Sequence, residues 1–170
     1  MTIDMQENPI YVVLDGSITL NRTAKEVWPY VLNYTLWQDF SHAEHISGEE
    51  GGEGEVVLLK KEEKGLEEFP PYYGRTLKIV PEKQFVWKTY PRKLDDDTMD
   101  FSGIVDFRLK EVDGKTIFSY YFYYEFIAKG LSEQEIVSAR DSYIESFHTV
   151  FSSIFPKLKN AVESDMMDKK

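Results

Sequence analysis

The dipeptide Asp113-Gly114 is the feature that most constrains how this chain can fold. Both central positions of the favoured two-residue hairpin turn need positive φ, which aspartate and glycine tolerate better than most residues. Apolar and polar residues alternate on either side of the dipeptide, as expected for two strands with one buried face each. The sequence therefore predicts an antiparallel hairpin that turns at these two residues.

The turn also predicts which side chains share a face of the sheet. If Val112 pairs with Lys115, directly opposed residues lie on the same side. The apolar side then carries Phe101, Gly103, Val105, Phe107 and Leu109 on one strand, and Phe118, Tyr120, Phe122, Tyr124 and Phe126 on the other. The opposite side pairs Arg108 with Ser119 and Asp106 with Tyr121, and we expect it to be solvated. Gly103 opposite Tyr124 leaves room for the tyrosine ring and for a bend in the strand.

The segment before this hairpin begins with a strand and a short helix. Ile10 to Leu20 is rich in apolar and β-branched residues, and we expect this strand to be bent or interrupted at Asp15-Gly16. Thr23 and Glu26 form a capping box that predicts the start of a helix. Pro29 lies inside this helix, where it removes a backbone hydrogen bond and should kink or divide it.

A short helical piece is expected from Trp37 to Ala43, followed by six short strands between Glu44 and Ala128. Strict alternation around Lys88 places Phe85, Trp87 and Thr89 on the inner face. The same reasoning around Lys78 places Tyr73, Arg75, Leu77 and Ile79 on the inner face. A guanidinium at position 75 would then need an acidic partner or an acidic ligand group, because burying it unpaired is costly.

A second capping box, Ser132 with Glu135, predicts a long C-terminal helix that ends near Leu158 and bends near Pro156. Its apolar stripe consists of Ile136, Tyr143, Ile144, Phe147, Val150, Phe151, Ile154, Phe155 and Leu158. A stripe of this size must pack against the apolar face of the sheet. The fold class is therefore α+β, with a seven-stranded curved antiparallel sheet wrapped around the long helix and a split short helix after the first strand.

Composition limits the partners of the chain. Its 170 residues fit a single domain, 1–170, with an ordered core of about 10–160. A net charge of -10 disfavours nucleic acid and anionic membranes. The sequence has no cysteine, no signal-like N-terminus and no run of about 20 apolar residues, so we expect a cytoplasmic protein without membrane insertion. Whether it is a monomer or a homodimer is left open.

Several local motifs resemble those of one superfamily. Ser17-Ile18-Thr19-Leu20, continuing through Thr23 and Glu26 to Val27-Trp28, is similar to the opening strand and helix of the START-related SRPBCC superfamily. Gly74-Arg75 and Pro81 with Phe85-Val86-Trp87 are similar to its middle strands. Its members include the birch-pollen allergen, lipid-transfer domains and polyketide cyclases. The resemblance implies the helix-grip fold and a cavity between sheet and helix that receives a hydrophobic or amphipathic small molecule.

Three functions follow from this reasoning. The first is binding or carriage of a hydrophobic small molecule, without a cofactor. The second is a cyclase or dehydratase acting on an aromatic or polyketide substrate in the same cavity. The third is a protein-interaction module with a filled core, whose contact surface is formed by the outward Tyr121 and Tyr123.

The predicted site residues are mainly aromatic. The expected ligand contacts are Tyr73, Arg75, Trp87, Phe101, Val105, Phe107, Tyr120, Phe122, Tyr124, Tyr143, Phe147 and Phe151. The candidates for acid-base catalysis are His148, Arg75, Tyr120 and Tyr143, and each also has a purely structural interpretation. His42 and His45 beside Glu44 suggest a metal pair, but no further ligand is placed by spacing, so no metal site is predicted.

Overall fold

A computed structural model describes residues 7–33, 42–60, 72–91 and 101–164 of the chain. Its helices and strands follow one another as β1 (Glu7–Leu20), α1 (Ala24–Val31), β2 (His42–Ser47), β3 (Val56–Lys60), β4 (Tyr72–Val80), β5 (Gln84–Pro91), β6 (Phe101–Val112), β7 (Lys115–Lys129) and α3 (Glu133–Glu163). The seven strands form one antiparallel sheet in the order β1-β7-β6-β5-β4-β3-β2. The expected fold class is confirmed.

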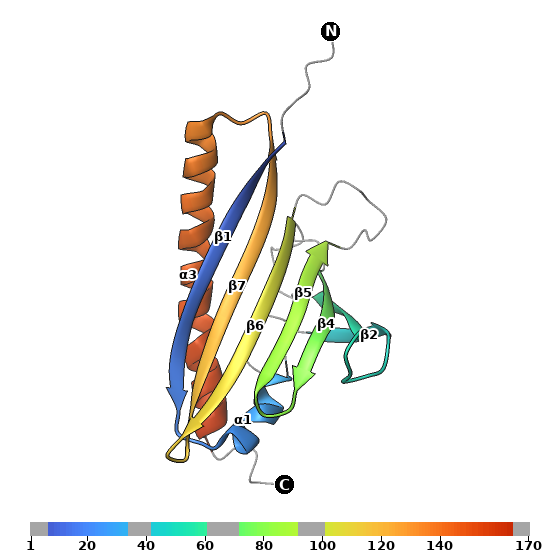
Figure 1. Cartoon of the computed structure of the whole chain (residues 1–170), viewed down its shortest axis with the longest axis vertical. Helices are drawn as coiled ribbons and strands as arrows, with labels where there is room; N and C mark the ends of the chain where they lie inside the picture. Colours follow the sequence, from blue (N-terminus) through green and yellow to red (C-terminus); the bar gives the residue numbers. More distant parts are fainter. Residues whose placement is uncertain (1–6, 34–41, 61–71, 92–100, 165–170) are drawn as a thin grey trace.

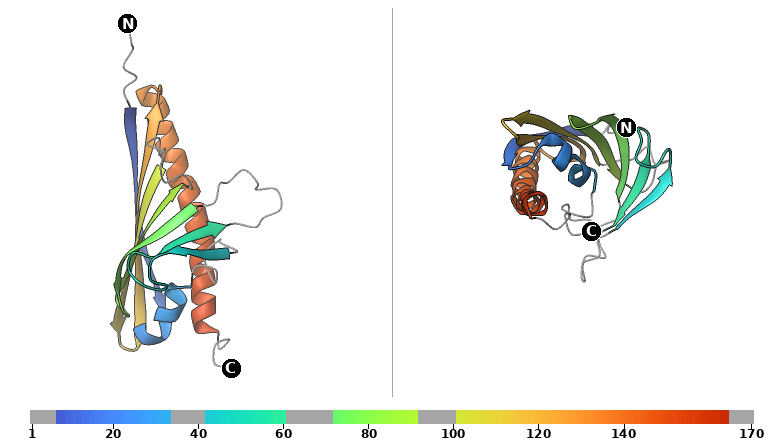
Figure 2. Two further views of the ribbon diagram at one scale, coloured as in Figure 1. Left: turned by 90° about the vertical axis from the view of Figure 1, so that its right-hand side faces the viewer. Right: turned by 90° about the horizontal axis from the view of Figure 1, so that it is seen from below.

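The sheet is strongly curved, and α3 lies along one side of its concave face (Figure 1). Seen along the long axis of the molecule, the strands form an arc with α3 inside one end of it and β2 and β3 at the other end (Figure 2). Helix α3 packs most closely against β1 and α1. Among the described residues, no helix is long and apolar enough to cross a membrane.

The hairpin register is confirmed along its whole length. Val112 pairs with Lys115, and Gly103 pairs with Tyr124. The turn has φ values of 53° at Asp113 and 73° at Gly114, both in the left-handed region that the turn type requires. Val105, Phe107 and Phe122 are buried and Tyr120, opposite Phe107, is partly buried, so this apolar face is the concave face of the sheet.

Both capping boxes are present, at Thr23 with Glu26 and at Ser132 with Glu135. Pro156 has less effect than expected, because α3 contains it and extends to Glu163. Pro29 lies inside α1, and that helix ends two residues later. The short helix expected before β2 falls mostly on residues 37–41, which lie outside the described part of the chain, and Ala43 belongs to β2.

The expected interruption of the first strand is wrong, and Tyr120 explains the glycine that suggested it. Strand β1 pairs with β7 without a register shift through Asp15 and Gly16. Gly16 lies opposite Tyr120, and a Cβ at Gly16 would be 2.5 Å from the Cζ of that ring. The glycine is therefore required because an aromatic ring lies over its backbone, while the strand itself continues.

The expected orientation of the first half of β4 is also wrong. A β-bulge between Thr76 and Lys78 interrupts the alternation, so that two residues of β4 fall where one was assumed. Thr76 consequently faces inward and is buried, and Leu77 is exposed. Tyr73 and Arg75 move to the convex face, where Arg75 lies opposite Lys88.

Gly103 on β6 offers a direct test of this packing. A Cβ there would be 2.6 Å from Cδ1 of Tyr124 and 2.8 Å from Oγ1 of Thr89. We predict that Gly103→Ala lowers the free energy of unfolding by about 1 to 3 kcal/mol, because lifting the Tyr124 ring from the strand would disturb its stacking on Phe147. Urea denaturation measures this change.

The matched control is the same substitution in a Tyr124→Ala background. Without the ring, we expect Gly103→Ala to cost less than about 0.5 kcal/mol, because the Thr89 hydroxyl can rotate and alanine restricts the unfolded chain. Equal costs in the two backgrounds would show that the ring does not lie over the glycine.

Candidate functional site

The concave face is closed against α3 by a ladder of aromatic rings. Strand β7 and helix α3 run antiparallel here, so their inward residues meet in reverse order. Three nearly parallel stacked pairs result, with ring centroids 4.0 Å apart for Tyr120–Phe155, 4.0 Å for Phe122–Phe151 and 4.3 Å for Tyr124–Phe147.

The ladder is possible because two repeat lengths nearly agree. Inward residues of a strand recur every second residue, about 6.7 Å apart. Residues at i and i+4 on a helix recur about 6.0 Å apart along its axis. The mismatch of about 0.7 Å per step is small enough for three consecutive pairs to stack, which fixes how α3 lies along β7. We call these six residues the ring ladder.

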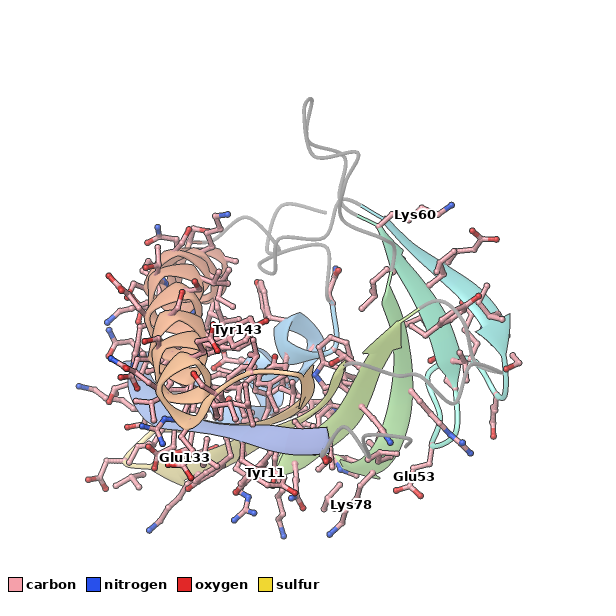
Figure 3. All side chains as sticks on the ribbon, turned by 90° about the horizontal axis from the view of Figure 1, so that it is seen from above. Tyr11, Glu53, Lys60, Lys78, Glu133 and Tyr143 are labelled. Atoms are coloured by element: carbon pink, nitrogen blue, oxygen red, sulfur yellow. The ribbon has the colours of Figure 1, made fainter. Side chains whose placement is uncertain are left out.

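Burial falls off along α3 toward its N-terminal end. The buried residues of this helix are Phe151, Ile154, Phe155, Leu158 and Val162, all in its second half. Phe147 is only partly buried, and Tyr143, one turn earlier, is 40% exposed. Figure 3 shows Tyr143 on the side of α3 that faces the space enclosed by the sheet. The first half of the helix is therefore not sealed against the sheet.

The part of the sheet across from this half of α3 carries short inward side chains. One row of inward positions, which we call the low row, runs from Val57 on β3 through Gly74, Thr89 and Gly103 to Tyr124 on β7. Three neighbours in this row are glycine or threonine. A Cβ on Gly74 would be 2.9 Å from Cε3 of Trp87, so the indole lies over that glycine much as the Tyr124 ring lies over Gly103. Rings that lie flat against the sheet project less far into the concave side than rings that stand away from it.

The predicted ligand contacts divide into three groups. Trp87, Val105, Phe107, Phe122 and Phe151 are buried in the core. Tyr120, Tyr124 and Phe147 are partly buried and Tyr143 is exposed. Tyr124 and Phe147 form the less buried end of the ladder and Tyr143 lies one turn beyond it, whereas Tyr120 stacks on buried Phe155 at the other end. Tyr73 and Arg75 face the other side of the sheet, and the side chain of Phe101 lies outside the described part of the structure.

The four predicted catalytic candidates do not converge. Arg75 lies on the convex face, whereas Tyr120 lies on the concave face and stacks on Phe155. His148 is exposed on α3, and Tyr143 is on the side of α3 that faces the concave space. The two tyrosines share the concave side, but Tyr120 lies at the level of Phe155, about 18 Å along the helix axis from Tyr143.

The convex face is less fully solvated than expected. Asp106 is buried there, and it accepts hydrogen bonds from Nε2 of Gln84 at 3.0 Å and from Nη2 of Arg108 at 2.8 Å. The Arg108 guanidinium also lies 4.9 Å from the centre of the Tyr121 ring. Tyr121 is therefore part of a polar cluster, and Tyr123 is the more exposed of the two outward tyrosines.

The structure adds one polar pair to the concave face that the sequence did not reveal, His45 and Glu55. His45 on β2 lies opposite Val57, which belongs to the core, so the two residues share the concave face. From the sequence His45 was considered only with His42 as a metal ligand. Among the described residues, no group of three or more potential metal ligands is present. In the sequence, the one signal of this pair was the run of glycines between β2 and β3, because glycines allow the sharp turn that brings Glu55 back to His45.

No protein-family model and no curated protein matches the sequence. Solved structures do match. A protein of unknown function from Staphylococcus aureus superposes with a TM-score of 0.70 at 11% identity, over 95% of this chain and 98% of that one. Truncated norcoclaurine synthase from Thalictrum flavum gives a TM-score of 0.64 at 13% identity, over 94% and 98% of the two chains.

A third similar structure is the di-domain ARO/CYC protein BexL from the BE-7585A biosynthetic pathway. It matches with a TM-score of 0.66 at 13% identity, over 91% of this chain and 51% of BexL. At these identities the likeness concerns the fold. It confirms the helix-grip fold that the sequence resemblance implied.

Tyr120 gives the ring ladder a dependence on pH. Burial raises the pKa of its phenol, and the charge of Asp15 raises it further. The folded protein therefore holds this proton more tightly than the unfolded chain does. The resulting contribution to stability is complete below the unfolded pKa of about 10 and is lost as pH rises through the higher folded pKa.

We predict that the free energy of unfolding falls less steeply with pH in Tyr120→Phe than in the unmodified protein, between about pH 9 and about pH 11. The substitution keeps the ring that stacks on Phe155 and removes only the ionisable hydroxyl. Urea denaturation at a series of pH values measures the two slopes. Identical slopes would show that the phenol is not buried in the folded state.

Proposed function

We propose that this protein binds a hydrophobic or amphipathic small molecule on the concave face, between the sheet and the first half of α3. One observation carries the proposal: the rings that face inward from this half of the helix are incompletely buried, with Tyr143 40% exposed. Exposed aromatic surface beside a sheet row of low relief favours a flat apolar ligand, which would cover the rings and remove them from water.

The ligand would extend the ring ladder by one level. Tyr124 and Phe147 form its last stacked pair, and Tyr143 lies one helical turn beyond Phe147. A planar molecule inserted beside this pair would gain the offset stacking that the three existing pairs already use. The fully buried members of the ladder, Phe122 and Phe151, then act as its rigid support.

The comparisons support a small-molecule role at a coarse level. Norcoclaurine synthase is an enzyme by name, and BexL is described as an ARO/CYC protein of a biosynthetic pathway. Both share this fold. A cyclase or dehydratase activity in the same concave site therefore stands as the alternative function, with Tyr143 as the member of the predicted acid-base set that lies beside this site.

A second candidate function is favoured by the convex face. Tyr11 and Val13 on β1, Tyr123 on β7 and Ile104 on β6 are all exposed there. Val13, Tyr123 and Ile104 lie side by side in one row across the three strands. Contiguous exposed apolar groups of this kind favour contact with another protein. We call this group the convex patch.

A pair of substitutions separates the two faces. Tyr143 and Tyr123 are the same residue type with similar exposure, 40% and 44%, on opposite sides of the sheet. We predict that Tyr143→Asp weakens binding of an uncharged apolar probe such as N-phenyl-1-naphthylamine at least about tenfold, because it places a charge at the contact surface. Tyr123→Asp should change the affinity less than about twofold. Isothermal titration calorimetry at several temperatures measures affinity and heat-capacity change, which should be negative because apolar surface is buried.

The opposite pattern would overturn the proposal. If Tyr123→Asp abolishes binding of the probe while Tyr143→Asp has no effect, the convex patch is the binding surface. If the unmodified protein does not bind the probe, the concave site is closed in solution. Circular dichroism of both variants, whose substituted positions are already exposed, verifies that they fold.

A further inference from the structure

The concave face carries a polar group at the edge farthest from α3. His45 belongs to β2, the edge strand of the sheet, and its neighbours in the same inward row are Val57 and then Gly74. Its side chain is 40% exposed. Among the described inward-facing residues of β2, β3, β4 and β5, His45 is the one side chain that can carry a charge.

Glu55 determines the orientation of the His45 imidazole and which of its two ring nitrogens carries the proton. Oε1 of Glu55 lies 3.0 Å from Nδ1 of His45, and Oε2 accepts a hydrogen bond from the backbone N–H of Gly51 at 2.8 Å. A carboxylate can only accept, so Nδ1 must carry the proton of the neutral ring. Nε2 is then left with its lone pair, as an acceptor that points away from the carboxylate.

The chain between β2 and β3 is built to bring these two residues together. Gly48, Gly51 and Gly54 have φ values of 85°, 75° and 86°, which other residues rarely adopt. A Cβ at Gly48 would be 2.7 Å from the carbonyl oxygen of Gly54, so the two ends of the turn touch. The side chain of Glu55 is only 12% exposed beneath His45. A carboxylate held this firmly gives the imidazole a defined direction.

The distance from His45 to the low row of the sheet suits a small aromatic molecule. Gly74 and the indole of Trp87 that lies over it are two strands away, about 10 Å at the usual spacing between strands. This is comparable to the length of a fused two-ring molecule with a polar group at one end. A ring on the low row would thus place a terminal hydroxyl within reach of β2.

We propose that His45, oriented by Glu55, is a polar anchor at the β2 edge of the concave face. Its ligands are aromatic molecules that lie over the Gly74 end of the inward row, away from the ring ladder, and carry a weakly acidic hydroxyl of the phenol or enol class. The hydroxyl donates its hydrogen bond to Nε2 of His45, and Glu55 keeps that nitrogen unprotonated by accepting the hydrogen bond from Nδ1. Arg75, the anchor expected from the sequence, faces the opposite side of the sheet and does not take this role. The inference rests on the proposed binding of apolar molecules to the same face.

Two probes that differ by one hydroxyl test the anchor, 2-naphthol and naphthalene. In the unmodified protein and in His45→Leu, we expect similar affinities for naphthalene, within about twofold, because that molecule makes no hydrogen bond. We expect 2-naphthol to bind about tenfold more weakly to His45→Leu, the loss of one hydrogen bond to a polar partner. His148→Leu, which removes an exposed histidine on α3, is the matched control and should leave both affinities unchanged.

A spectroscopic measurement on the unmodified protein is independent of how the variant folds. Long-range ¹H–¹⁵N spectra should show Nδ1 of His45 protonated and Nε2 bare in the neutral ring. Saturating 2-naphthol should shift the Nε2 resonance, and saturating naphthalene should not. A structural ion pair that merely ties the turn to β2 would show no such difference.

The possible failures are distinguishable. If naphthalene and 2-naphthol both bind the unmodified protein, but His45→Leu leaves their affinity ratio unchanged and Nε2 does not respond, the anchor is refuted and the binding function stands. If neither probe binds, the proposed function fails and the anchor fails with it.

Discussion

The stacking of three rings of β7 on three rings of α3 is the interaction on which the rest of the structure depends. It works because the inward repeat of a strand and the one-turn repeat of a helix are nearly equal in length. Tyr120–Phe155 and Phe122–Phe151, at 4.0 Å each, hold the helix along β7, at the end of the arc away from β2 and β3. The position of α3 at one end of the arc is thus a consequence of where the ladder forms.

Glycines determine how the rings lie. Tyr120 lies over Gly16, Tyr124 over Gly103 and Trp87 over Gly74, each on the neighbouring strand. A side chain at any of these glycines would lift the ring toward the helix and reduce the depth of the concave face. Stability and binding capacity therefore depend on the same residues. The ring ladder needs the glycines for its packing, and the proposed ligand needs them for its space.

Short-range signals in the sequence predicted much of this fold, and the failures have specific physical causes. Asp113-Gly114 predicted the register of β6 and β7 because the turn alone fixes that pairing. The capping boxes predicted both helix starts for the same local reason. Arg75 was misplaced because a bulge at Thr76 to Lys78 arises from pairing with β5, which strict alternation does not include. His45 and Glu55 were not paired because their contact depends on the positive φ values of the glycines between them.

The central claim is that an apolar ligand lies between the first half of α3 and the low row of the sheet. Intermolecular nuclear Overhauser effects between bound naphthalene and the aromatic protons of the protein test it most directly. The account predicts cross-peaks from the ligand to Tyr143, Phe147 and Tyr124, and none to Tyr11 or Tyr123. Cross-peaks to Tyr11 and Tyr123 without any to Tyr143 or Phe147 would place the ligand on the convex patch and contradict the account.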